Sequence, residues 1–205
     1  MRIDSLSEVQ RNLNHGFVPV FIDETGKSLN EISPDILIDG RMLKRNPSIS
    51  RSMAKLVIGM GPGFNAGENC HAVVETMRGH SLGRVLWKGA ALPDTCVPEA
   101  VDGRVGERVL RASKNGEVRS NAEIGTHLKA DQRAASVNGQ DVLAPFEGVL
   151  RGLMHTGTKV SAGEKIGDID PRDIREHCFA ISDKALTIGG GVLEAVMSWL
   201  NQTNQ

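Results

Sequence analysis

The sequence contains no tyrosine, and only 3% of its residues are aromatic. Side chains that stack on nucleobases are therefore scarce, and the formal net charge of −1 lacks the basic surplus that nucleic acid attracts. No apolar run approaches membrane-spanning length, and the first residues carry charge where a signal peptide needs an apolar core. These absences predict a cytoplasmic protein with neither nucleic acid nor a membrane as its partner.

Cysteine is also rare, since the chain holds only Cys70, Cys96 and Cys178. Three scattered cysteines are too few for a disulfide framework or a CxxC metal site, so a reducing environment and no metal site are predicted. Cys70 precedes His71, and a neighbouring imidazolium would lower the pKa of a thiol. Cys70 is therefore either an activated catalytic or carrier thiol or a buried structural residue.

Glycine and proline, by contrast, are plentiful, with 23 and 8 copies in 205 residues. This density of turn formers indicates many short strands. Ser5–Asn14 has apolar residues at helical spacing and stops before Gly16, so it is predicted to be a helix. The apolar segments at 17–22, 35–39 and 56–58 are predicted to be strands of a partial Rossmann-like parallel α/β sheet, with Pro19 placing the first at an edge.

The strand at 56–58 runs into Gly59, Gly61 and Gly63, and Pro62 stiffens this turn. Ligands of open α/β sheets bind at such strand ends, where glycines let the backbone approach them. The segment between positions 41 and 55 holds five cations and no acid. If the strands at 35–39 and 56–58 are parallel neighbours, this basic segment leaves the sheet at the same edge as the glycine loop.

The residues predicted to bind an oxyanion at this edge are Arg41, Lys44, Arg45, Gly61 and Gly63. Arginines would supply charge and the glycine amides would supply oriented donors. The alternative is that Pro47 turns the basic segment away into solvent. The glycine loop would then be a plain turn at the end of a strand.

A hairpin is predicted next, because extended structure is favoured at 73–74 and 85–87 with glycines between. Arg78 and His80 would lie at its turn, where they could meet an anion or simply be solvated. On a strand, His71 and Glu75 would stand about 13 Å apart, so they are not expected to share a metal ion.

The second half contains an internal repeat, because Leu110–Val137 aligns without a gap to Val142–Ile169 at an offset of 32 residues. Six aligned positions are identical, where chance predicts about two. The identical pairs are Ala112/Ala144, Gly116/Gly148, Arg119/Arg151, Gly125/Gly157, Thr126/Thr158 and Ala130/Ala162. Asn138-Gly139 is typical of a type I′ turn and would join the two copies.

This repeat resembles the biotinyl/lipoyl-type barrel-sandwich hybrid, through Ala144–Gly148 and Gly157–Ile166. In carrier domains the joining hairpin holds the modified lysine, whereas Val137–Val142 has none. The fold is therefore expected without biotin or lipoate. Past position 170 the pattern turns helical, and Ile188, Val192, Val196 and Trp199 share one helical face.

Four stretches together resemble the selenium-dependent molybdenum hydroxylase system proteins of the YqeB type. These stretches are Val57–Gly67, Val73–Gly83, Gly167–Arg172 and Ile181–Glu194. Longer members begin with a glycine-rich, nucleotide-binding-like segment that is lacking here, so a nucleotide cofactor is not expected from these residues. The resemblance implies a role in maturing molybdenum hydroxylases that carry a labile selenium ligand.

Three functions follow as hypotheses. The first is an accessory protein that binds a molybdenum cofactor, a selenium species or the target hydroxylase through the glycine loop, the basic segment, Arg78 and His80. The second is a selenium or sulfur transferase with Cys70 as carrier, and the third is a non-catalytic interaction module. The expected organisation is an α/β region at 1–105, the hybrid at 106–170 and a helical segment at 171–205.

Overall fold

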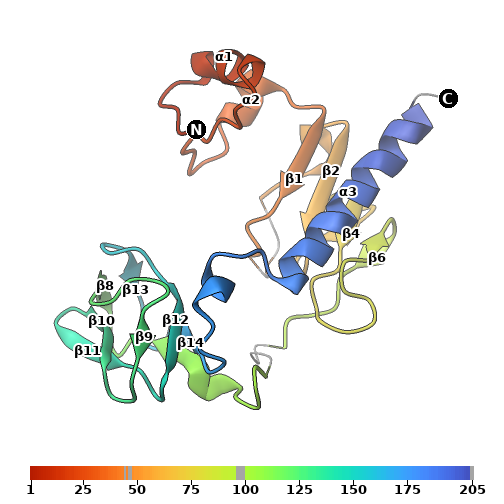
Figure 1. Cartoon of the computed structure of the whole chain (residues 1–205). Coiled ribbons are helices and arrows are strands. Elements are labelled where there is room, and N and C mark those ends of the chain that lie inside the picture. The colour runs from red at the N-terminus through yellow and green to blue at the C-terminus, as the bar shows by residue number, and fades with distance from the viewer. Residues whose placement is uncertain (44, 46–47, 96–99, 204–205) are drawn as a thin grey trace. The chain divides into compact units, whose positions relative to one another are not determined.

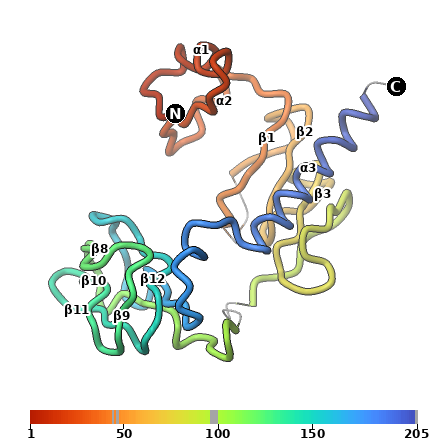
Figure 2. Tube along the Cα trace, viewed as in Figure 1, coloured from red at the N-terminus to blue at the C-terminus, as the bar shows by residue number. Residues whose placement is uncertain are grey.

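The computed structural model describes residues 1–43, 45, 48–95 and 100–203 (Figure 1). Internal contacts divide the chain into two units. The first comprises Met1–Asp94 together with the C-terminal residues from Asp183, and the second comprises Thr95–Ser182. Figure 2 shows this course: the chain leaves the first sheet, builds the second unit and returns as the C-terminal helix.

The first unit is built on a four-stranded mixed sheet of order β1-β2-β4-β5. Its strands are β1 (Ile36–Asp39), β2 (Leu56–Met60), β4 (Ala72–Val74) and β5 (Val85–Leu86). β1, β2 and β4 are parallel, and β5 is antiparallel to β4. The predicted parallel pair and the predicted hairpin are both confirmed. Two short strands, β3 (Asn65–Ala66) and β6 (Gly89–Ala90), form a separate antiparallel pair.

Helix α3 (Asp183–Thr203) packs against β2, β4 and β5. The face predicted from helical spacing is the one that packs, since Ile188, Val192, Val196 and Trp199 join the core around Leu56 and Ile58. Gly191 permits this approach, because a Cβ there would lie 2.1 Å from the carbonyl oxygen of Gly83. Gly189 and Gly190 have no such neighbour within 4 Å.

The N-terminal helix predicted at 5–14 is confirmed as η1 (Leu6–Glu8) followed by α1 (Val9–Asn14), and Ser5 and Glu8 form a capping box at its start. α2 (Ser28–Ile32) follows. The strand predicted at 17–22 is wrong. Only Val20 pairs there, in an isolated bridge with Arg2, because no described strand runs beside the rest of the segment. Pro19 also has no amide proton to donate to a ladder.

The second unit repeats four strands. β7 (Val109–Arg111), β8 (Gly116–Ser120), β9 (His127–Leu128) and β10 (Arg133–Val137) are followed, at an offset of about 32 residues, by β11 (Gln140–Leu143), β12 (Gly148–Leu153), β13 (Lys159–Val160) and β14 (Lys165–Asp170). They form two sheets of order β11-β10-β8-β13 and β7-β14-β12-β9, each holding strands from both copies. The described strands form no closed barrel, so the hybrid fold itself stays a prediction.

The core of the second unit follows the repeat, since pairs such as Val118 and Leu150, or Val137 and Ile169, are all buried in one cluster. The predicted type I′ turn is present, because Asn138 and Gly139 both have positive φ, at 47° and 81°. The remaining short helices are η2 (Arg51–Met53), η3 (Gly106–Arg108) and η4 (Arg175–Cys178). Within the described ranges, no helix combines the length and apolarity needed to cross a bilayer.

Candidate functional site

Three strand ends meet at one edge of the first sheet. β1, β2 and β4 run parallel, so the segments that follow Asp39, Met60 and Val74 all emerge there. The loop after β2 packs on the loop after β4, because a Cβ on Gly61 would lie 2.4 Å from the hydroxyl oxygen of Thr76. In open α/β sheets this edge is the usual place for a ligand.

The basic segment reaches the same edge. A Cβ on Gly63 would lie 2.1 Å from the carbonyl oxygen of Arg45, and the φ of Gly63 is +100°. Both facts require glycine at this position, since any side chain would meet the backbone of Arg45. The expectation that the two loops leave the sheet together is therefore confirmed. Lys44 and Pro47 lie outside the described residues.

Arg41 is held by the strand end from which it departs. Its Nε donates to Oδ1 and Oδ2 of Asp39 at 3.0 and 3.1 Å, and its Nη2 donates to Oδ2 at 2.5 Å. Asp39 is almost fully buried, and the Arg41 guanidinium lowers the pKa of its carboxyl group. The pair has no net charge, so Arg41 is fixed in place but adds little attraction for an anion.

The other described cations of this segment differ in whether their side chains already form an ion pair or a hydrogen bond. Lys55 forms an ion pair of 2.7 Å with Asp35, and Nη1 of Arg51 donates to the carbonyl oxygen of Gly67 at 3.0 Å. Arg45 is exposed, and no ion pair or hydrogen bond of its side chain is found among the described residues. Arg45 is therefore the described cation at this edge whose charge is available to a ligand.

The two loop amides also differ. The N–H of Gly61 donates to the carbonyl oxygen of Val74 at 2.9 Å, so this amide closes the strand end. The N–H of Gly63 makes no hydrogen bond within the described part of the chain, and Gly63 is partly exposed. The donor set that the edge offers a ligand is thus the Gly63 amide beside Arg45.

Glu75 is a buried residue at this edge to which the sequence assigned no role beyond its distance from His71. Its Oε1 accepts hydrogen bonds from the amides of Thr76 and Met77, and its Oε2 accepts one from the amide of Leu92, each at 2.8 Å. A carboxylate satisfied by three backbone donors ties the loop after β4 to the segment near Leu92. The sequence signal was an acid directly after a buried apolar strand.

Arg78 and His80 lie in the turn between β4 and β5, and the ion pair of Arg78 is directed to α3. Arg78 forms a bidentate ion pair with Asp183, the first residue of α3. Nearby, a Cβ on Gly83 would lie 2.6 Å from the side chain of Thr187. This turn therefore docks α3 on the sheet, while His80 is exposed.

Cys70 is fully buried, and burial raises the pKa of its thiol to about 11. His71 does not activate it. The Nδ1 atom of His71 accepts a hydrogen bond from the amide of Val57 at 2.9 Å, and burial lowers the pKa of its imidazole. A neutral imidazole cannot stabilise a thiolate by charge, so the geometry favours the structural alternative for Cys70. Within the described ranges, no cluster of histidine, cysteine and acidic side chains could hold a metal ion.

Comparison with known proteins gives one informative relative. Residues of this chain are 41% identical over 198 positions to the uncharacterized protein YqeB of Escherichia coli strain K12. The match covers 97% of this chain but only 37% of that protein, so the chain spans well under half the length of this relative.

The other comparisons add little. No family model matches the chain. An aspartoacylase family protein from Mesorhizobium loti is 10% identical, covers 31% of this chain and 22% of its own, and has a TM-score of 0.27, which is too low to support an argument. Nearly the whole of this chain is therefore similar to a part of YqeB.

Proposed function

We propose that this chain is an accessory protein in the maturation of selenium-dependent molybdenum hydroxylases. We propose further that it binds a small oxyanion, such as molybdate or the phosphate of a molybdenum cofactor, at the edge formed by the ends of β1, β2 and β4. The association with molybdenum hydroxylases rests on the sequence resemblance described above. The binding rests on the geometry of the edge.

One observation carries the proposed site: the backbone of Arg45 packs directly on Gly63. This contact places an exposed guanidinium and an unbonded amide on adjacent loops at the carboxyl ends of parallel strands. A cation and an oriented N–H donor together suit an oxyanion better than either alone. Asp39 and Glu75 stiffen the edge, because Asp39 fixes the start of the basic segment through Arg41 and Glu75 ties the loop after β4 to Leu92.

The residues at this edge bind and orient rather than react. Arg45 supplies charge, the Gly63 amide supplies direction, and the Arg41–Asp39 pair fixes the start of the basic segment. Neither carboxylate is free to act as a base, since Asp39 pairs with Arg41 and Glu75 accepts three amide protons. This supports a carrier or holding role over a catalytic one.

The second unit has a separate part in the proposal. Its repeat and its strand exchange between sheets support a biotinyl/lipoyl-like hybrid without a swinging arm, since the joining turn is Asn138-Gly139. We propose no transferase function for Cys70, because its thiol is buried and its pKa is raised.

An interaction module remains the second candidate, and one observation favours it. Helix α3 leaves a line of large apolar side chains exposed on the face opposite the sheet: Leu186, Leu193, Met197 and Leu200. Such a stripe is typical of a surface that another protein covers. This candidate does not exclude the anion site, which lies at the ends of different elements.

Calorimetry would test the anion site. Molybdate, phosphate and a pterin phosphate are titrated into the parent chain and into Arg45→Ala at low and at moderate salt. A direct, partly desolvated contact should lose on the order of 2 kcal/mol on truncation, or roughly 30-fold in Kd. Lys88→Ala is the matched control, because Lys88 is an exposed cation between β5 and β6 of the same unit.

Binding that survives moderate salt, weakens in Arg45→Ala and is unchanged in Lys88→Ala would support the site. Absence of binding by the parent chain would contradict the proposal. Equal weakening in both variants, or loss to salt alone, would show diffuse surface attraction instead.

A further inference from the structure

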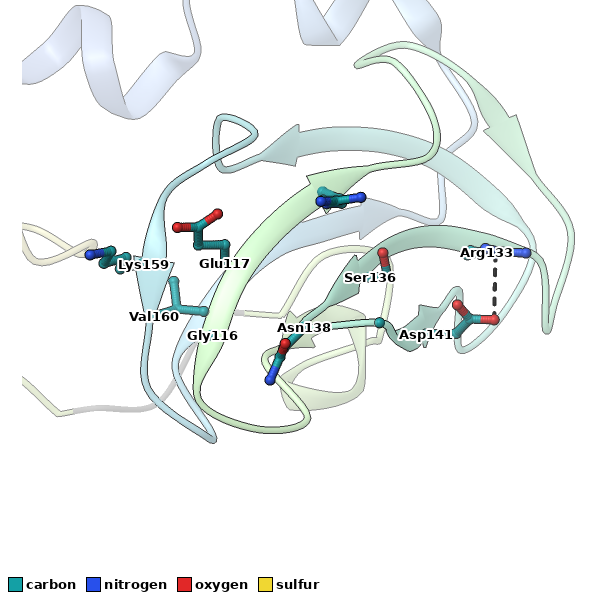
Figure 3. Close-up of a pocket in the computed structure, with 10 residues that line it drawn as sticks. Gly116, Glu117, Arg133, Ser136, Asn138, Asp141, Lys159 and Val160 are labelled. Atoms are coloured by element: carbon teal, nitrogen blue, oxygen red, sulfur yellow. Dashed lines mark ion pairs between the residues drawn. The ribbon is translucent and has the colours of Figure 1, made fainter.

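The two sheets of the second unit differ in what covers their outer faces. The segment after β14 folds back, and η4 packs against β12. In the repeat, β8 is the counterpart of β12, and β10 is the counterpart of β14. β10, however, is followed by a two-residue turn and not by a covering segment. A pocket of about 840 Å³ lies there instead, lined by β8, β10, β11 and β13 (Figure 3).

Residues at equivalent positions match this difference. Val149 on β12 is 2% exposed, whereas its counterpart 32 residues earlier, Glu117, is exposed and lines the pocket. Val109 on β7 is 8% exposed, and its counterpart Asp141 is likewise an exposed pocket residue. The outer face of the sheet that contains β12 therefore has apolar residues where the segment after β14 covers it. The outer face of the sheet that contains β8 has charged residues at the equivalent positions.

Two basic side chains occur at equivalent places on both faces. On the covered face Nη1 of Arg151 donates to Asp170 at 3.2 Å, and Nδ1 of His127 lies 2.7 Å from a carboxylate oxygen of Asp173. Asp173 belongs to the covering segment. Where the face is covered, acids of the chain itself therefore contact both basic side chains.

On the open face the two basic residues are kept, and neither has the acidic partner that its counterpart has on the covered face. Arg119 is the counterpart of Arg151, and Lys159 is the counterpart of His127. The position of Asp170 is taken by Asn138, which carries no charge. The position of Asp173 is taken by Asp141, which pairs with Arg133 at 3.4 Å. Neither Arg119 nor Lys159 has an ion pair within the described residues, and both line the pocket.

We infer that this pocket binds an acidic peptide segment of a partner protein, whose carboxylates pair with Arg119 and Lys159 as Asp170 and Asp173 pair with Arg151 and His127. The remaining charges allow this. Asp141 is already paired with Arg133 at 3.4 Å, which leaves Glu117 as the acid that the ligand must avoid. Ser136 and Asn138 add neutral hydrogen-bonding groups along β10 and its turn (Figure 3).

The test uses the full chain and two pools of fluorescein-labelled peptides of roughly 12 residues. One pool has aspartate at two fixed positions three apart, the spacing of Asp170 and Asp173, and the other has asparagine at both. Fluorescence anisotropy should show binding of the aspartate pool that weakens at least about tenfold in Arg119→Ala/Lys159→Ala. Lys129→Ala removes an exposed cation outside the pocket and should leave binding unchanged.

A second variant approaches the same question from the other side. Asn138→Asp would supply Arg119 with the carboxylate that Arg151 has, and aspartate tolerates the φ of 47° at this turn. It should weaken peptide binding severalfold without unfolding the chain. Four results would overturn the inference: no binding of the aspartate pool, equal binding of the asparagine pool, no effect of the double variant, or binding of inorganic phosphate without binding of peptide.

Discussion

At the scale of single residues, the edge of the first sheet is stabilised by buried carboxylates. Asp39 and Arg41 have the pattern Ile-Asp-x-Arg, which recurs at Asp170 and Arg172 with the same hydrogen bonds from Nε and Nη2. In both places the arginine two residues later lowers the pKa of a buried aspartate. In both places, therefore, the charge of a buried aspartate at the end of a strand is balanced by the arginine two residues later.

Because the folded pKa of Asp39 lies below its ordinary value of 3.8, its contribution to stability is present at neutral pH. That contribution is lost as the pH falls below about 4 and through the lowered folded pKa. Asp39→Asn should lower the free energy of unfolding by about 1–3 kcal/mol at neutral pH. Urea unfolding at neutral and acid pH should show the difference between variant and parent shrinking with acidification. A constant difference would contradict the pairing.

Cys70 and Cys178 should differ in reactivity. Cys70 is buried with a pKa raised to about 11, whereas Cys178 is partly exposed. Iodoacetamide near neutral pH should modify Cys178 well before Cys70, since reactivity follows access and thiolate fraction. Peptide mass spectrometry reads out both sites, and labelling in urea is the control. Faster labelling of Cys70 in the folded chain would restore the carrier hypothesis.

At the scale of elements, the sequence predicted the helices and strands that show a clear spacing of apolar residues within their own segment. Helical spacing identified the buried face of α3, and apolar runs bounded by glycine identified β1 and β2. The strand expected at 17–22 failed because its apolar residues had no neighbouring ladder, and Phe17, Val18 and Ile22 stay exposed. An apolar run shows that burial is favourable, but it does not supply the strand beside it.

The glycine triplet of α3 yields a matched pair of substitutions. A Cβ at Gly191 would lie 2.1 Å from the carbonyl oxygen of Gly83 and 2.9 Å from a methyl group of Val74. Gly191→Ala should therefore destabilise the first unit by about 1–3 kcal/mol. Gly190→Ala meets nothing within 4 Å and should stabilise the helix by about 0.5–1 kcal/mol. Chemical denaturation of both variants checks the pair, and a similar effect of the two would contradict the packing.

At the scale of the molecule, the exact offset of the repeat was visible in the sequence, whereas its consequence for the two sheet faces was not. The covering of β12 depends on η4, which follows the repeat, and the spacing of the repeat does not predict that contact. The candidate site was predictable in part. The predicted order of the strands brings the segment of Arg45 to Gly63. The pairing of Arg41 with Asp39, and the hydrogen bond from the Gly61 amide to Val74, depend on local geometry that residue spacing does not predict.

The two Ile-Asp-x-Arg turns lie in different units, so they test whether the units unfold separately. Both tryptophans, Trp87 and Trp199, belong to the first unit. Asp39→Asn should shift the denaturation midpoint seen by tryptophan fluorescence, because its partner Arg41 lies in that unit. Asp170→Asn should leave that midpoint in place and shift part of the far-ultraviolet circular dichroism transition. One transition moved equally by both variants would contradict separate cores.

The central claim is that an oxyanion binds where the basic segment meets the glycine loop. Crystals of the chain soaked in sodium molybdate and measured at the molybdenum absorption edge would locate the anion directly. The predicted result is an anomalous molybdenum peak placed so that the molybdate oxygens accept hydrogen bonds from the Gly63 amide and the Arg45 guanidinium, absent in Arg45→Ala. Occupied molybdate positions elsewhere, with none at this edge, would contradict the claim.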